Sequence, residues 1–98
     1  MCGIVGFIGT ANEAELAEGV AAIGHRGPDG SGDVLLADGK VGFGHTRLSI
    51  IDLSSAGSQP MVDDATGVVL TFNGEIYNFR ELQSELRQKE HEFKSSSD

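Results

Sequence analysis

The alternation of apolar and polar residues predicts a chain of short strands with two helices. Residues 3–8 are apolar on both alternating faces, which is typical of a central strand covered on both sides. Between Asn12 and Gly24 the apolar residues recur at helical spacing, with Asn12 suited to cap the helix and Gly24 to end it. Residues 25–32, rich in glycine, are predicted to form an irregular loop.

Two hairpins are predicted in the middle of the chain. Asp38-Gly39 separates residues 33–37 from residues 40–45 and favours a two-residue type I′ turn, which needs positive φ at both positions. A longer connection joins residues 59–62 to residues 68–73 in a second hairpin. Antiparallel strands should therefore dominate this region.

A second helix is predicted to begin after Asn78, because Glu81 three residues later completes a capping-box pattern ahead of an apolar stripe. Residues 90–93 resemble the start of a strand, and residues 94–98 a loop. With helices on one side of the strand layer, the other apolar face would stay open. We therefore expect the chain to be incomplete.

Composition narrows the class of protein. The 98 residues suffice for one small domain, and 15 acidic against 7 basic side chains give a net charge of −8, which argues against nucleic acid as a partner. A single cysteine excludes an intrachain disulfide and favours a reducing compartment, so we expect a cytoplasmic protein. No export signal or membrane span is evident, and the three histidines lack the spacing of a metal site.

The lone cysteine, Cys2, is the first candidate for chemistry. Removal of Met1 would leave its thiol beside a free α-amine, which titrates near ~7.7–8.0 and can act as a general base. The alternative is an inert cysteine at the start of a core strand.

Three further positions could complete a site for amide hydrolysis. Asn73 and the Gly74 N–H could donate to an oxyanion, although Asn-Gly is also a common turn. Arg47 could hold a carboxylate in two hydrogen bonds, or pair with a surface acid. Glu75 and Asp98 could face an α-ammonium group, or be solvated.

The combination is more specific than its parts. Five stretches occur in this order: Cys2-Gly3-Ile4-Val5-Gly6, His25-Arg26-Gly27-Pro28-Asp29-Gly30, His45-Thr46-Arg47-Leu48-Ser49-Ile50-Ile51-Asp52, Gln59-Pro60-Met61 and Asn73-Gly74-Glu75-Ile76-Tyr77-Asn78. Together they closely resemble the N-terminal glutaminase domain of glutamine-hydrolysing asparagine synthetases, a class II glutamine amidotransferase. The resemblance covers essentially the whole chain.

The resemblance implies an α+β fold, namely the N-terminal part of an N-terminal-nucleophile hydrolase αββα sandwich with mainly antiparallel strands and two helices. Residues 1–98 would be a partial type 2 glutamine amidotransferase (glutaminase) domain, with the synthetase domain absent. The isolated fragment is expected to be inactive.

For the site, the resemblance implies that L-glutamine is the substrate and ammonia a product. Cys2 would be the nucleophile, and Asn73 and Gly74 the oxyanion hole. The rest of glutamine would be held by Arg47, Leu48, Ile50, Glu75 and Asp98. No metal or cofactor is expected in this segment. ATP, Mg²⁺ and aspartate would act only through the missing domain, and the parent enzyme could form a homodimer.

Two alternatives stay open. The parent could be a related amidotransferase with another acceptor, such as a peptide or a sugar acid. The chain could also be a non-catalytic binding module that recognises glutamine or a partner protein.

Overall fold

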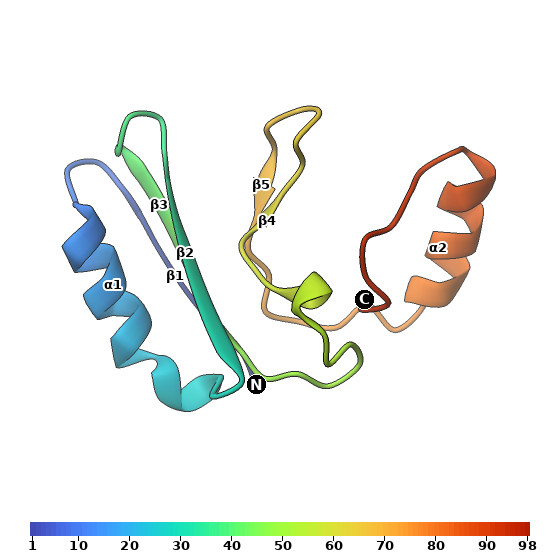
Figure 1. Ribbon diagram of the computed structural model, residues 1–98, viewed down its shortest axis with the longest axis horizontal. Coiled ribbons are helices and arrows are strands. Elements are labelled where there is room, and N and C mark those ends of the chain that lie inside the picture. Colours follow the sequence, from blue (N-terminus) through green and yellow to red (C-terminus); the bar gives the residue numbers. More distant parts are fainter.

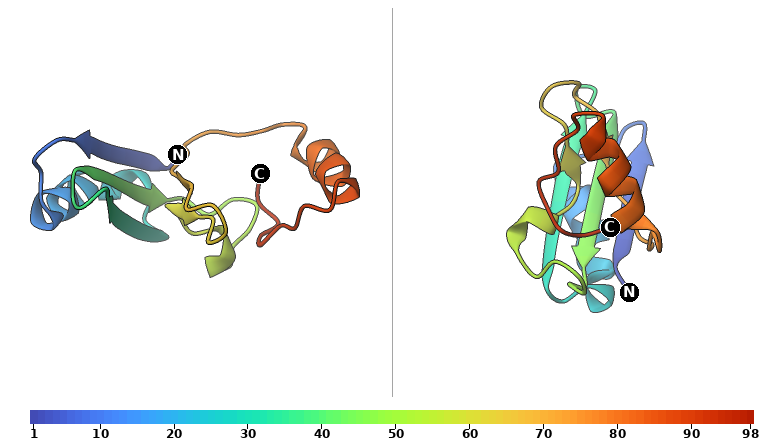
Figure 2. Two further views of the ribbon diagram at one scale, coloured as in Figure 1. Left: turned by 90° about the horizontal axis from the view of Figure 1, so that it is seen from above. Right: turned by 90° about the vertical axis from the view of Figure 1, so that its right-hand side faces the viewer.

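The computed structural model describes residues 1–98 and arranges them in four successive layers (Figure 1). Helix α1 (Glu13–Ala22) lies on one side, followed by a three-stranded sheet, then a two-stranded sheet, and finally helix α2 (Phe79–Gln88). The view from above gives the same order along the long axis (Figure 2). The helices therefore lie at opposite ends of the molecule, and the expectation of helices on one side of a strand layer is wrong. The predicted α+β class with two helices and antiparallel strands is confirmed.

The first sheet contains β1 (Gly3–Ile8), β2 (Gly30–Leu36) and β3 (Val41–Arg47), all antiparallel. The strand order is β1-β3-β2, so β3 is central and β1 lies at an edge. The prediction of a central first strand is wrong, because the β2–β3 hairpin leaves the free edge of β3 to pair with β1. Ile8, the last residue of β1, is 90% exposed.

Helix α1 covers one face of this sheet, as its spacing predicts. Asn12 caps it by accepting a hydrogen bond from the Glu15 N–H at 2.9 Å, and Leu16 and Val20 are its buried side chains. Gly44 of β3 lies beneath both of them, where a Cβ would collide with Val20. The absence of a side chain at Gly44 therefore lets the helix approach the sheet closely.

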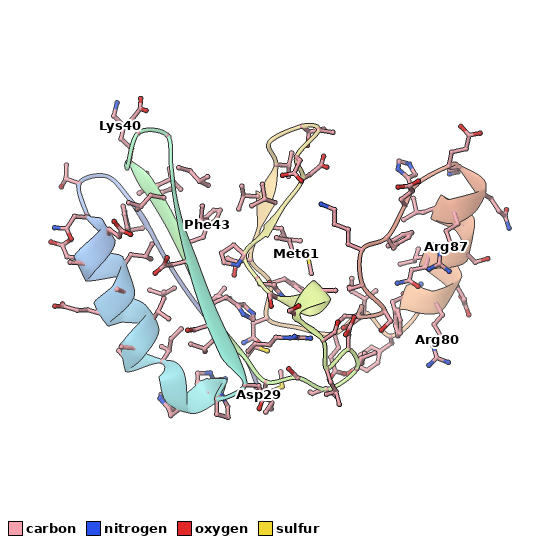
Figure 3. The ribbon with its side chains drawn as sticks, viewed as in Figure 1. Asp29, Lys40, Phe43, Met61, Arg80 and Arg87 are labelled. Carbon is pink, nitrogen blue, oxygen red and sulfur yellow. The ribbon has the colours of Figure 1, made fainter.

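The opposite face of the first sheet is turned toward the second sheet. Phe43 points in that direction (Figure 3). The register pairs Phe43 with Gly6 and Val34, while the alternate positions Val5 and Gly44 face α1. His45, two residues beyond Phe43, lies on the same inner face.

The loop before β2 is more regular than predicted. A 3-10 turn, η1, covers Gly24–Arg26, and β2 begins at Gly30. The following turn has positive φ at Ala37, Asp38 and Gly39, so it is longer than the predicted two-residue turn. Leu36 and Val41 are the last paired residues on either side.

The second hairpin pairs β4 (Met61–Val62) with β5 (Val69–Leu70), in the predicted place but with shorter strands. Between the two sheets the chain makes a 3-10 turn, η2 (Ser55–Gly57). Helix α2 begins after Asn78 as predicted, but the Asn78 side chain makes no cap hydrogen bond, so the predicted capping box is not formed.

The strand predicted at residues 90–93 is absent, and these residues are irregular. Glu90 has φ of 66°, and the His91 N–H bonds back to the Leu86 carbonyl at 3.0 Å. This backward bond ends α2 in a tight turn rather than an extended segment. Both helices are ten residues long, and neither has the length and apolar character needed to cross a membrane.

Candidate active site

The eight residues singled out from the sequence all line one cavity of about 190 Å³. They come from the two chain ends, from the end of β3 and the residues after it, and from the segment after β5: Cys2, Arg47, Leu48, Ile50, Asn73, Gly74, Glu75 and Asp98. The cavity is smaller than the ~300–1,000 Å³ typical of pockets for drug-sized ligands. Its size suits a ligand on the scale of an amino acid.

Cys2 lies at the entrance to β1, half-buried on the cavity wall. Its Sγ accepts a hydrogen bond from the Leu48 N–H at 3.3 Å and lies 3.7 Å from the Leu48 carbonyl oxygen, to which the thiol can donate. These contacts hold the sulfur beside the end of β3 while leaving it open to the cavity. The cysteine is therefore not fully buried, and its role as a nucleophile stays a prediction.

Arg47, the last residue of β3, is fixed by the loop that follows it. Its guanidinium donates to the Ser54 carbonyl at 2.5 Å and to the Asp52 carbonyl. The chain's two ion pairs lie elsewhere, so Arg47 has no carboxylate partner. A guanidinium has five N–H donors, which leaves donors for a ligand in the cavity.

The Asn73-Gly74 dipeptide follows β5 and has no hydrogen-bond partner within the chain for its side-chain amide or for the Gly74 N–H. Asn73 is half-buried and Gly74 is exposed. Two uncommitted donors therefore occur side by side on the cavity wall, as an oxyanion hole requires.

Asp98 lies against the segment that carries Glu75. Its Oδ2 accepts a hydrogen bond from the Ile76 N–H at 2.7 Å, which brings both predicted acids to the same side of the cavity. Leu48 and Ile50, which follow Arg47 in the chain, also line the cavity. One guanidinium and two carboxylates thus line the same small cavity. This arrangement suits a ligand that carries one negative and one positive group.

Asp52 does not line the cavity but connects two segments that do, and the sequence did not assign it a role. Its side chain accepts hydrogen bonds from the Ser54 N–H and hydroxyl at 2.8 and 2.6 Å and from the Ser96 N–H at 3.0 Å. These bonds, led by the Ser54 hydroxyl, hold the pKa of the Asp52 carboxyl well below its ordinary value. Asp52 therefore stays ionised at neutral pH and ties the segment bearing Asp98 to the loop that holds Arg47.

His45 and Gln59 also line the cavity and were not assigned a role from the sequence, although both lie in the quoted motifs. Burial lowers the pKa of His45, which is only 1% exposed. The sequence does place the polar side chain of His45 at an inward-facing strand position. It does not indicate the hydrogen-bond partner of His45, because Phe72 lies 27 residues further along the chain.

Gly57 gives a test of the Arg47 position. A Cβ at residue 57 would collide with the Arg47 guanidinium, the movable end of a long side chain. Gly57→Ala should therefore displace the guanidinium without unfolding the chain and raise KM for a carboxylate-bearing substrate about tenfold, with kcat little changed. Gly24→Ala is the matched control, because a Cβ there meets open space. An unchanged KM in Gly57→Ala would contradict the assigned position of Arg47.

Comparison of the sequence with known proteins identifies the family of the chain. A family model described as a glutamine amidotransferase domain matches residues 1–98. The chain is 43% identical to asparagine synthetase [glutamine-hydrolyzing] 1 of Bacillus subtilis (strain 168) and 42% identical to asparagine synthetase [glutamine-hydrolyzing] of Zea mays. It is also 38% identical to the amidase chry2 of Gibberella zeae.

These matches take in the whole of this chain but only 16%, 17% and 16% of the three relatives, respectively. The chain thus spans about a sixth of the length of the curated relatives that it matches. No solved structure gave a significant match. Because the family model matches from the first residue to the last, the chain belongs to the glutamine amidotransferase domain family.

Proposed function

We propose that this chain is the N-terminal part of a glutamine-hydrolysing asparagine synthetase and that its cavity hydrolyses L-glutamine to glutamate and ammonia. The observation that carries the proposal is the gathering of Cys2, Arg47, the Asn73-Gly74 donors and the two acids around one cavity. The asparagine synthetases among the relatives support the choice of parent enzyme.

In the proposed reaction the Cys2 thiol gives its proton to the α-amine freed by removal of Met1. The sulfur attacks the side-chain amide carbon of glutamine, and the carbonyl oxygen becomes an oxyanion held by Asn73 and the Gly74 N–H. Collapse of this intermediate breaks the C–N bond, and the nitrogen leaves as ammonia after taking up the proton. Water then hydrolyses the thioester, which releases glutamate and restores the thiol.

The charged groups of the cavity account for the choice of substrate. Arg47 would hold the α-carboxylate of glutamine, and Asp98 with Glu75 would hold its α-ammonium, beside the backbone of Leu48 and Ile50. A ligand that lacks either charge would leave a charged group of the site unpaired, which would weaken its binding relative to glutamine.

The further steps belong to parts of the parent enzyme outside this chain. There ATP and Mg²⁺ would activate aspartate for amidation by the ammonia, in the cytoplasm. The molecule that accepts the ammonia could differ from aspartate, because the relatives include an amidase as well as asparagine synthetases. Formation of asparagine by the full-length protein in the presence of aspartate would identify aspartate as the acceptor.

Covalent labelling tests the glutaminase proposal directly. A chloroketone analogue of L-glutamine should alkylate Cys2 of the full-length protein at least about tenfold faster than its D-enantiomer, because the charged groups orient only one of them. Intact-mass measurement on the same sample should show that Met1 has been removed. Equal rates for the two enantiomers, or retained Met1, would favour a non-catalytic binding module.

A further inference from the structure

Phe72 immediately precedes the proposed oxyanion-hole residue Asn73, and its backbone is held by side chains rather than by a strand partner. It lies beyond the last paired residue of β5, Leu70. Its N–H donates to Oε1 of Gln59 at 2.6 Å, and its carbonyl oxygen lies 3.2 Å from Nε2 of His45. Two successive peptide planes before Asn73 are therefore fixed by two side chains.

His45 is a rigid anchor for this contact. It lies in the central strand, paired with Ile4 on one side and Gly32 on the other, and is 1% exposed. Because Nε2 faces a carbonyl, it must carry the hydrogen that is donated. Nδ1 is then an acceptor, and it has no partner in the chain.

Gln59 is anchored against the same sheet. Its backbone carbonyl lies against Gly32, where a Cβ would come within 2.5 Å of the oxygen. Gly32 is also the partner of His45 in the β2–β3 ladder. The two residues that hold Phe72 are therefore both anchored at Gly32 in the first sheet. The same sheet carries Arg47, and its strand β1 begins immediately after Cys2.

We propose that His45 and Gln59 are positioning residues, which clamp the Phe72 backbone and thereby aim the Asn73 amide and the Gly74 N–H at the oxyanion. This role rests on the proposed glutaminase function. It explains how Asn73 and Gly74, which lie outside any strand, can be held at a fixed position relative to Cys2 at the start of β1. A misplacement of about 1 Å at such donors can cost ~100-fold in rate.

The test compares variants of the full-length protein that keep or remove each hydrogen bond. Gln59→Met removes the acceptor at similar size, and Gln59→Glu keeps one. His45→Leu removes the donor, and His45→Gln keeps one. We expect kcat for glutamine hydrolysis to fall about 10- to 100-fold in Gln59→Met and in His45→Leu, with KM for glutamine changed less than about threefold.

The conservative variants should recover most of this loss, and alkylation of Cys2 by iodoacetamide should be unchanged throughout. Gln88→Met, at the exposed end of α2, is the matched control. Gln59 is the safer site, since it is only half-buried and its variants should fold even where His45→Leu does not. Equal losses in Gln59→Met and Gln59→Glu, or parallel changes in KM and in alkylation, would overturn the positioning role.

Hydrogen exchange separates this inference from the proposed function. In Gln59→Met the Phe72 amide should exchange at least about tenfold faster than in the wild type, because its only acceptor is lost. Unchanged exchange would overturn the clamp. A wild-type protein that does not hydrolyse glutamine would overturn the proposed function and the catalytic part of this role, while faster exchange would still show that the clamp exists.

Discussion

Replacement of Cys2 by alanine in the full-length protein is expected to abolish glutamine-dependent synthesis while sparing synthesis from added ammonia. Loss of a nucleophile removes the covalent route altogether, and comparable losses in other hydrolases cost about 10⁴-fold or more in kcat. The acceptor reaction would be untouched, since ammonia enters it without the thiol. Asparagine formation measured with each nitrogen source gives both rates from one preparation.

The ammonia-dependent rate is the internal control for folding of the variant. Cys2 is the only cysteine among residues 1–98, so no neighbouring thiol in this region can substitute for it. Undiminished activity with glutamine would refute the assignment of Cys2 as nucleophile. Loss of both activities would instead indicate that the variant is misfolded, which circular dichroism of the purified protein can establish.

Replacement of Asn73 by alanine should lower kcat for glutamine hydrolysis about 10²- to 10³-fold, the usual cost of losing one oxyanion-hole donor. KM should change little, because the donor acts on the charge that develops in the transition state and not on bound glutamine. Steady-state assays of ammonia release by the full-length protein measure both constants.

Asn78→Ala is the matched control for this variant. Asn78 carries the same side chain a few residues away but makes no cap hydrogen bond at α2. Its replacement should leave kcat within about twofold, because exposed positions of this kind contribute little. A loss in Asn73→Ala no larger than in Asn78→Ala would mean that the oxyanion is held by other groups.

Local patterns in the sequence predicted the elements better than their arrangement. The bounds of β1 and the cap at Asn12 follow from residues within a few positions, and both predictions are confirmed. The edge position of β1 could not be predicted, because apolar residues on both faces are compatible with any strand whose partners are unknown. The absent strand at residues 90–93 has a similar cause, since extended propensity without a partner strand does not form a ladder.

The candidate site shows the same division. Motif resemblance brought together residues that the structure also brings together, from Cys2 to Asp98. It gave no role to His45, Gln59 or Asp52, because their importance lies in hydrogen bonds to backbone groups. A backbone acceptor or donor has no residue-type signature, so the sequence cannot mark its partner. The roles of the eight motif residues stay predictions until the variants are measured.

Residues from both ends of the chain line the cavity, so the cavity cannot form until the whole segment has been translated. The cysteine is made almost at the start, whereas the carboxylate of Asp98, which bonds to the Ile76 N–H, is made 96 positions later. At translation rates of about 5–20 residues per second, the thiol therefore waits roughly 5 to 20 s before its cavity can close. During that interval the nascent chain would carry the proposed nucleophile without the carboxylate proposed to hold its substrate. If the cavity hydrolyses glutamine as proposed, hydrolysis would begin only after residue 98 has been made.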